Sequence, residues 1–283
     1  MSSVQLKGHS GGLRLLTLWL PLAFFLIFIL FPFFWTVVTA FKSNVEINAR
    51  PMTYLPQSPS FENFQTAWEG VGFSIFFLNS MFLSVVSVAF ITLISVMVGY
   101  ALSRYLFRGK QLFLVMLLCT QFIPGAMLII PLFLIFKDLH LINTLASLVI
   151  VYVTFHLPFS AILIRGFVST IPVTLEEAAM IDGCGRFRAV TVAVLPLLAP
   201  GMVASSAFAF VGCWNEFLYA LMFISKKALF TLPVGLRYMV GEYGVDYGAL
   251  AAGSLIVLVP AVILFAFVQR YMVSGLSSGA VKG

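Results

Sequence analysis

Residues 174–183 read Thr-Leu-Glu-Glu-Ala-Ala-Met-Ile-Asp-Gly and form the most charged interruption in a strongly apolar chain. Pro172 ends the preceding helix, because a proline disfavours helical backbone before it and cannot continue a helix. Thr174 and Glu177 have the spacing of a capping box, which predicts that a new helix starts here. Gly183 supplies the left-handed residue at which many helices end. The stretch therefore predicts a short helix between Pro172 and Gly183.

This short helix is expected outside the hydrocarbon, with an acidic start and a small-residue face. Glu176 and Glu177 fall in its first turn, where the positive end of the helix dipole stabilises carboxylates. One face is formed at helical spacing by Leu175, Ala178, Ala179 and Asp182. The two alanines leave that face nearly flat, which suits docking into a groove on another protein. A solvated turn without a partner is the alternative interpretation.

The composition excludes a water-soluble domain. Of the 283 residues, 61% are apolar and 9% are charged, and the mean hydropathy is +1.07. A soluble protein carries about a quarter charged residues. The chain is therefore predicted to lie in a lipid bilayer. Its net charge of +6 is interpreted by position along the chain, and it indicates no nucleic-acid partner.

Six apolar runs are long enough to cross a bilayer, which takes about 20 residues. The predicted spans are about 15–41, 76–102, 112–136, 144–169, 197–224 and 247–268. They divide the chain into an amino-terminal arm at 1–14, a transmembrane domain at 15–270 with a cytoplasmic loop at about 170–196, and a tail at 271–283. Pro124 and Pro131 predict a kinked or broken third span.

The external loop from Lys42 to Gly70 contains a second short helical pattern. Phe61, Phe64 and Trp68 repeat there at helical spacing. This helix is expected either on the membrane surface or packed on the protein.

Basic residues decide the predicted orientation, because cytoplasmic loops carry an excess of Lys and Arg. With the amino terminus inside, the internal basic residues are Lys7, Arg14, Arg104, Arg108, Lys110, Arg165, Arg186, Arg188, Arg270 and Lys282. The external ones are fewer, namely Lys42, Arg50, Lys137, Lys226, Lys227 and Arg237. Both termini and the loop at 170–196 are therefore expected in the cytosol.

Sequence motifs of nucleotide-binding proteins and metalloenzymes are missing. The sequence contains no GxxxxGK[ST] phosphate loop, no HExxH and no GxGxxG. Cys119, Cys184 and Cys213 are scattered and the three histidines lie far apart, so no metal site or disulfide framework is predicted. We expect no catalysis and no cofactor bound by this chain. Uphill transport would draw its energy from a partner or from an ion gradient.

Polar residues inside the predicted spans are candidates for a translocation path, because they are costly in hydrocarbon unless satisfied. Trp214, Asn215 and Glu216 stand together in the predicted fifth span. They fit an interfacial aromatic beside a solvated carboxylate. They equally fit a path lining, with the indole ring stacked on a ring of the substrate and the polar groups bonded to its hydroxyls. Gln121 and His156 fit interhelical hydrogen bonds or substrate contacts.

The opening stretch resembles the cytoplasmic EAA loop of permease subunits in ATP-binding-cassette importers, through Glu177-Ala-Ala, Gly183 and Leu195-Pro196. Further stretches similar to the carbohydrate-importer branch are Asn79-Ser80, Tyr100-Ala-Leu-Ser-Arg104, Ile123-Pro124, Ile130-Pro131, Trp214-Asn-Glu-Phe217, Thr231-Leu-Pro-Val-Gly235 and Gly279-Ala-Val-Lys-Gly283. They span nearly the whole chain, which looks most like the second permease of a pair, the maltose-type G subunit. Ala193 departs from the larger aliphatic residue usual in the family, which is a packing change.

The resemblance implies an all-α membrane protein with six transmembrane helices, the type I importer fold and a cytoplasmic coupling helix. The implied function is that of a permease subunit in an ATP-driven, binding-protein-dependent sugar importer of the bacterial inner membrane. Its implied partners are a second homologous permease in a heterodimer, an ATPase dimer that binds ATP and Mg²⁺, and an extracytoplasmic sugar-binding protein. The ATPase-coupling residues would be Glu176, Glu177, Ala178, Ala179, Asp182 and Gly183.

Within that coupling loop, Glu177 is expected to be the charged anchor on the ATPase. Asp182 is expected to pair with Arg186 at helical spacing. An ion-coupled secondary transporter is the main alternative, but it would need inverted repeats and midplane ionisable residues, and the sequence shows no obvious repeat. A non-transporting scaffold would leave the broken third span unexplained.

Overall fold

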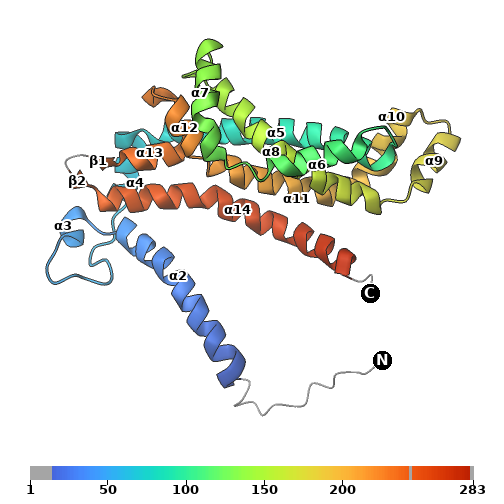
Figure 1. Cartoon of the computed structure of the whole chain (residues 1–283). Helices are drawn as coiled ribbons and strands as arrows, with labels where there is room; N and C mark the ends of the chain where they lie inside the picture. Colours follow the sequence, from blue (N-terminus) through green and yellow to red (C-terminus); the bar gives the residue numbers. More distant parts are fainter. Residues whose placement is uncertain (1–14, 242–243, 281–283) are drawn as a thin grey trace. The chain divides into compact units, whose positions relative to one another are not determined.

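The protein is helical almost throughout in its computed structural model, which describes residues 15–241 and 244–280 (Figure 1). The helices are α2 Leu20–Ala40, α3 Asn44–Ile47, α4 Glu62–Gln65, α5 Phe73–Arg104, α6 Lys110–Thr120, α7 Ile129–Asp138, α8 Leu145–Thr170, α9 Thr174–Ile181, α10 Arg186–Ala189, α11 Leu195–Trp214, α12 Leu218–Phe223, α13 Leu232–Tyr238 and α14 Tyr247–Ala280. Two strands, β1 Val240–Gly241 and β2 Gly244–Val245, pair antiparallel, which the sequence did not predict. The predicted arm at 1–14 lies outside the described residues.

Five helical segments of the described chain are long and apolar enough to cross a membrane. They are Leu16–Ala40, Phe73–Arg104, Leu145–Thr170, Arg186–Trp214 and Tyr247–Gln269. The remaining predicted span is broken, because its halves Lys110–Thr120 and Gly125–Asp138 meet at an angle of 92°. Pro124 stands directly before the second half, so the predicted break is confirmed. Counted as one span, the bent pair brings the number to six.

The fifth span differs most from its prediction. It was expected at about 197–224, but the helical segment runs from Arg186 to Trp214. It begins early because α10, a π-helical segment at Val190–Val194 and α11 follow one another without a break. It ends early because the chain leaves the helix at Asn215. At the other end of the chain, α14 continues to Ala280, so residues 271–280 of the predicted tail are helical.

One compact unit combines the chain up to Val71 with Met239–Leu255. The side chains along most of α2 are exposed, as expected for a helix that faces lipid. In the loop that follows, Asn63 donates hydrogen bonds from Nδ2 to the carbonyls of Ala40 at 2.9 Å and Lys42 at 2.6 Å. These bonds hold the short loop helix against the end of α2, while Phe61 on the same helical pattern stays 72% exposed.

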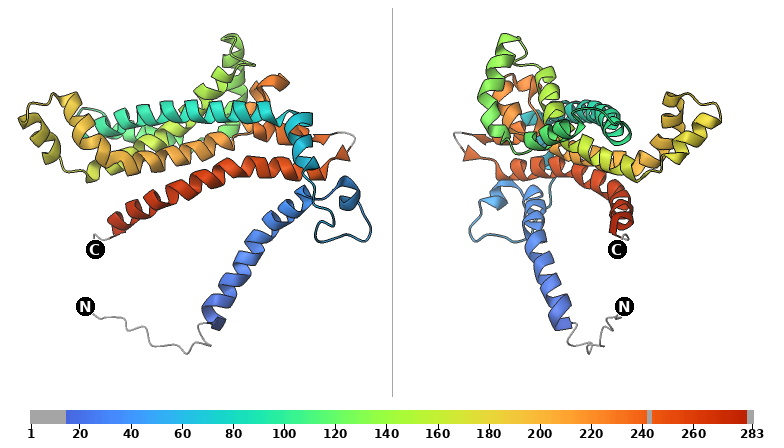
Figure 2. Two further views of the ribbon diagram at one scale, coloured as in Figure 1. Left: turned by 180° about the vertical axis from the view of Figure 1, so that it is seen from behind. Right: turned by 45° about the vertical axis from the view of Figure 1, so that its right-hand side comes forward.

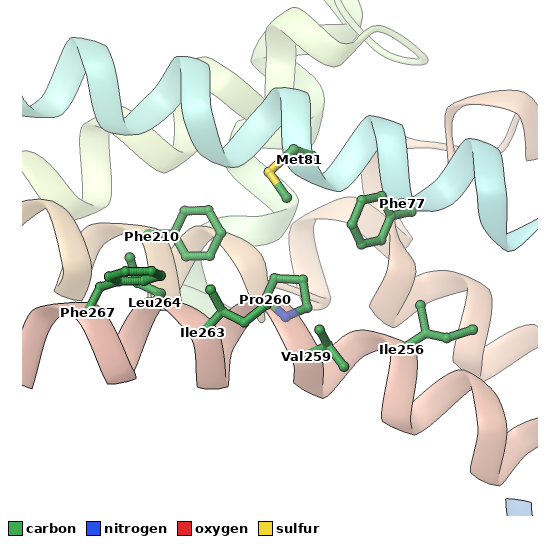
Figure 3. Close-up of a pocket in the computed structure, with 9 residues that line it drawn as sticks. All are labelled: Phe77, Met81, Phe210, Ile256, Val259, Pro260, Ile263, Leu264 and Phe267. Atoms are coloured by element: carbon green, nitrogen blue, oxygen red, sulfur yellow. The ribbon is translucent and has the colours of Figure 1, made fainter.

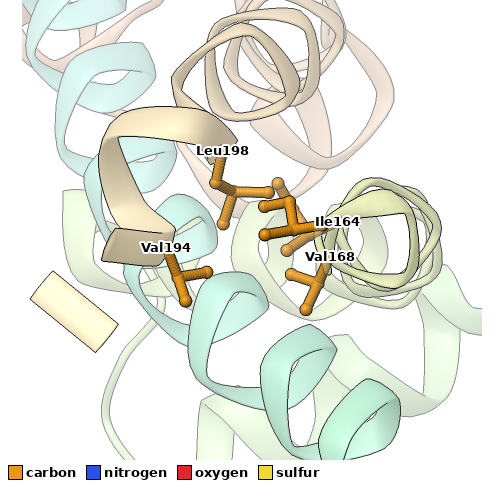
Figure 4. Close-up of a cluster of buried hydrophobic side chains, with 5 residues drawn as sticks. Ile164, Val168, Val194 and Leu198 are labelled. Atoms are coloured by element: carbon orange, nitrogen blue, oxygen red, sulfur yellow. The ribbon is translucent and has the colours of Figure 1, made fainter. Parts of the chain in front are cut away.

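The second unit comprises Gly72–Tyr238 and the part of α14 from Ile256 onward. Its centre is the packing of α5, α8 and α11 side by side (Figure 2). A buried cluster fills the end of this bundle near α9, and it consists of Ile164, Val168, Ile171, Val194 and Leu198 (Figure 4). Gly99 permits the close approach of α5 to α8, because a Cβ there would stand 2.8 Å from the backbone nitrogen of Arg165.

Hydrogen bonds identify which loops lie at each end of α5. Near its start, Asn79 donates from Nδ2 to the carbonyls of Ala228 at 2.9 Å and Phe230 at 3.0 Å. At its end, Arg104 donates from Nη2 to the carbonyl of Ile171 at 2.8 Å. The segment around Ala228 and the segment that leads into α9 therefore lie at opposite ends of the bundle.

Candidate functional site

The short helix predicted between Pro172 and Gly183 is present as α9, but its amino terminus is not capped as expected. Thr174 lies inside the helix, and Val173 is the cap residue without a side-chain hydrogen bond. Because Val173 already has helical dihedral angles, its carbonyl accepts from the backbone N–H of Glu176 at 2.9 Å and Glu177 at 3.2 Å. Backbone bonds thus replace the side chain of Thr174, and the predicted capping box is wrong.

The carboxyl terminus of α9 is built as the sequence predicted. Gly183 has φ +85°, the left-handed conformation that glycine adopts without a Cβ penalty. Its N–H donates to the carbonyl of Met180 at 3.1 Å, and the N–H of Cys184 donates to the carbonyl of Ala179 at 3.0 Å. This pair of bonds is a Schellman motif, which satisfies the last carbonyls and fixes where the helix ends.

The two adjacent glutamates of α9 occupy different environments. Glu176 is only 7% exposed, and its carboxylate accepts from Arg104 Nε at 2.5 Å and from the Tyr100 hydroxyl at 2.6 Å. Glu177, next in the chain, is exposed. The first-turn position predicted for both is correct, yet only Glu177 presents its carboxylate to the surroundings.

The surface of α9 that carries the predicted docking residues is largely exposed. Ala178 and Asp182 are exposed together with Glu177, and Ala179 is half-buried. At the end of α9 and in α10, the apolar side chains of Ile181 and Phe187 are 86% and 84% exposed. Unpartnered side chains of this size on a loop outside the bundle indicate a surface that another protein covers.

A cavity of about 200 Å³ lies beside this surface. It is lined by Ser103, Arg104, Val173, Glu176, Glu177, Met180, Arg186 and Ala189. The cavity joins the exposed carboxylate of Glu177 to the buried pair below it.

The expected pairing of Asp182 with Arg186 is wrong. Gly183 turns the chain between the two residues, so they do not share a helix face. Arg186 instead stacks its guanidinium over the ring of Tyr105 at 4.7 Å. An ion pair is formed nearby by Arg104 with Glu176.

The other group of predicted residues lies where the third, fourth and fifth spans meet. Glu216 accepts from the Tyr152 hydroxyl at 3.0 Å and from the backbone N–H of Tyr219 at 2.7 Å and Ala220 at 3.0 Å. The carboxylate therefore caps the start of α12 and joins it to α8.

Trp214 is a packing residue in this structure. It is 1% exposed, its indole Nε1 donates to the carbonyl of Val257 at 3.0 Å, and Phe210 stacks on its ring. The sugar-stacking role expected for Trp214 therefore has no exposed ring face here. Asn215 is exposed and donates from Nδ2 to the carbonyl of Val211 at 2.9 Å.

The remaining predicted path residues come from the third and fourth spans. Gln121 is exposed at the break that follows α6. His156 is half-buried and packs against Gly212, where an added Cβ would stand 2.2 Å from the imidazole Cε1. An apolar cavity of about 540 Å³ lies between α5, α11 and α14, lined by residues such as Met81, Phe210 and Phe267 (Figure 3). Its lining offers no polar side chain to a sugar.

Two important residues were not predicted to act together with α9. Tyr100 and Arg104 were noted only as part of a stretch shared with a family. Their spacing of one helical turn at the end of a span, with an arginine last, was the available signal. Their partner Glu176 could not be identified from spacing because it lies 72 residues beyond Arg104.

Comparisons with known proteins agree with this arrangement. Residues 91–277 match the family described as binding-protein-dependent transport system inner membrane component. The sulfoquinovosyl glycerol transport system permease protein SmoH of Agrobacterium fabrum is 37% identical over 90% of this chain and 89% of its own length. The diacetylchitobiose uptake system permease protein DasC of Streptomyces coelicolor is 37% identical over 90% of this chain and 92% of its own.

A solved structure shares the fold. A chain of a bacterial ABC transporter involved in the import of the acidic polysaccharide alginate superposes with a TM-score of 0.82 at 21% identity. The superposition covers 93% of this chain and 99% of that one. The predicted importer-permease fold is therefore confirmed.

Proposed function

The chain belongs to the family of binding-protein-dependent transport system inner membrane components, and we propose that it is a permease subunit of an ATP-driven sugar importer. It is a multi-pass inner-membrane protein and a transport component rather than an enzyme. The relatives named for sulfoquinovosyl glycerol and diacetylchitobiose support a glycosylated polyol or an oligosaccharide as the substrate.

The observation that carries this proposal is the exposed, rigidly ended helix α9. Glu177 and the small side chains of Ala178 and Ala179 form a surface with little relief, which lets a partner seat closely. The Schellman motif at Gly183 keeps that surface at a fixed length. We infer that a cytoplasmic ATPase dimer holds α9, binds ATP and Mg²⁺ itself, and moves the helix when it closes.

The other proposed partners complete the importer. A second, homologous permease forms the pore with this chain, as a heterodimer. An extracytoplasmic binding protein delivers the sugar to the opposite side. Gln121 and Asn215 are the residues best placed to line the path, since both amides are exposed. Trp214, Glu216 and His156 hold the surrounding helices in position.

Both termini and α9 are proposed to be cytoplasmic. Arg104 and Arg186 lie at the α9 end of the bundle, whereas Lys226 lies near Asn143 at the other end, where its N–H donates to Asn143 Oδ1 at 3.2 Å. An excess of basic residues on the α9 side is the pattern of a cytoplasmic face.

The test is capture of the ATPase. The chain is purified in mild detergent with the products of its neighbouring genes, as wild type, Glu177→Lys and Glu69→Lys. Wild type and Glu69→Lys, which changes the same charge outside the site, are expected to retain an ATPase and support sugar uptake in proteoliposomes. Glu177→Lys is expected to retain at least about 10-fold less ATPase and to take up sugar at least about 10-fold more slowly. Uptake that continues without an ATPase would contradict the proposal and favour an ion-coupled transporter.

A further inference from the structure

Helix α9 is connected to the bundle in two different ways. It lies against α10 and the π-helical segment Val190–Val194, which form the start of the fifth span. A polar connection reaches the second span, where Glu176 meets Tyr100 and Arg104 near the end of α5. Movement of α9 therefore reaches the fifth span along the chain itself, but reaches the second span through side chains.

The polar connection has the features of a rigid one. Arg104 and Glu176 are both nearly buried, with side chains 8% and 9% exposed, so solvent screens their attraction little. Charged hydrogen bonds from Arg104 Nε and from the Tyr100 hydroxyl occupy both carboxylate oxygens. Arg104 also donates from Nη2 to the carbonyl of Ile171, the residue that ends α8. One guanidinium thus joins the second span, the fourth span and α9.

We propose that Glu176 is a positioning residue that transmits the movement of α9 to the second span, through Arg104 and Tyr100. The inference rests on the proposed function, because it assumes that a partner moves α9. It assigns different roles to two adjacent glutamates. Glu177, which is exposed, contacts the ATPase, and Glu176, which is buried, carries the movement into the permease.

The bonding of Glu176 and the length of α5 both favour this division of roles between the two glutamates. Glu176 is buried, and each of its carboxylate oxygens already accepts a hydrogen bond inside the chain, from Arg104 and Tyr100, so it is less accessible to an external cation than Glu177. The 32-residue helix α5 extends from this contact to Phe73, at the other end of the bundle. A displacement imposed on Glu176 therefore acts on a helix that reaches the side opposite α9.

The experiment measures sugar uptake and ATP hydrolysis in proteoliposomes that contain the whole importer. The variants are Glu176→Gln, Arg104→Gln and the double variant, with Glu177→Gln as the matched control on the same helix. Glu176→Gln is expected to retain the ATPase within about twofold and to lower uptake per ATP hydrolysed by about 10-fold. Glu177→Gln is expected to weaken ATPase capture instead, with uptake per ATP unchanged in the complexes that form.

The double variant separates transmission from folding. It removes both buried charges, so it avoids the unpaired charge that each single variant leaves. If the two residues act as one connection, the double variant should lower uptake per ATP no further than either single variant does. A variant with the charges exchanged, Arg104→Glu with Glu176→Arg, should recover part of the wild-type uptake per ATP hydrolysed.

Each result decides between clear alternatives. Wild-type uptake per ATP in Glu176→Gln, or losses in the double variant that multiply, would overturn the assignment while leaving the proposed function intact. Failure of the wild-type chain to capture an ATPase would instead reject the proposed function, and the assignment with it. Reduced membrane levels in the double variant, with a normal ratio of uptake to hydrolysis, would show a structural role only.

Discussion

Tyr219 donates a hydrogen bond of 2.7 Å from its hydroxyl to the carbonyl of Gly125, and this bond joins the break in the third span to the start of α12. The ring of Tyr219 also packs against Phe155 on α8, with centroids 5.3 Å apart. Gly125 begins the short 3-10 turn Gly125–Leu128 that follows the break, and the hydroxyl of Tyr219 gives its carbonyl a partner from a neighbouring helix. The break is therefore stabilised by the tertiary structure and is a defined bend.

Replacing Tyr219 by Phe tests this stabilisation. The ring contact with Phe155 is kept, but the hydroxyl that bonds the carbonyl of Gly125 is lost. We expect a loss of about 1 kcal/mol of stability, measured as a lower midpoint of thermal unfolding in detergent. Tyr54→Phe, an exposed position in the external loop, serves as the control and should leave the midpoint unchanged. Equal midpoints for the two variants would contradict the role of the bond.

A close contact between α8 and α11 gives a second prediction. An added Cβ at Gly212 would stand 2.2 Å from the imidazole of His156, so Gly212→Ala should destabilise the protein by about 1–3 kcal/mol. Gly166→Ala is the matched control on α8, because a Cβ there meets nothing within 4 Å. In the double variant, adding His156→Ala to Gly212→Ala should restore part of the stability that Gly212→Ala alone loses, because the imidazole that the new Cβ meets is removed. Thermal unfolding of the four variants measures these effects, and a neutral Gly212→Ala would disprove the contact.

The sequence predicted the bundle because apolar run length depends on the bilayer and not on tertiary detail. The spans expected at 76–102 and 144–169 agree closely with Phe73–Arg104 and Leu145–Thr170. The fifth span was displaced because hydropathy does not distinguish α11 from α12, although a bend at Asn215 separates them. Glu216 stabilises this bend, because its carboxylate accepts hydrogen bonds from the backbone N–H groups of Tyr219 and Ala220 at the start of α12. This capping is recognised only when the positions of the two N–H groups are known.

The sequence predicted where α9 ends, but it did not predict which of the two glutamates of α9 is buried. Gly183 was identified correctly because a positive φ restricts the residue type at one position. The environments of Glu176 and Glu177 could not be separated, since adjacent carboxylates in one helical turn look alike until a partner is placed beside one of them. The distant partner here is Arg104, and pairing over such a separation leaves no periodic signal in a single sequence.

Gly183 and Gly185 provide a matched pair for testing the end of α9. Gly183 has φ +85°, whereas Gly185 has φ −66° and space for a Cβ. Gly183→Ala should cost about 1–2 kcal/mol, because a side chain in the left-handed region is strained. We expect it to lower uptake per ATP hydrolysed by shifting where α9 ends, and Gly185→Ala to behave like wild type. Similar ratios in the two variants would show that the end of α9 does not affect coupling.

Asn215 and Glu216 are adjacent but should respond differently to alanine. Glu216→Ala removes the acceptor of three hydrogen bonds, so we expect less protein in the membrane and a lower unfolding midpoint. Asn215→Ala removes an exposed amide that bonds one helix carbonyl, so we expect wild-type membrane levels. If Asn215 lines the path, its alanine variant should take up sugar at least about threefold more slowly at low sugar concentration. Immunoblots of membranes and initial uptake rates measure both quantities. Wild-type uptake in Asn215→Ala would remove this residue from the path and leave Gln121 as the exposed candidate.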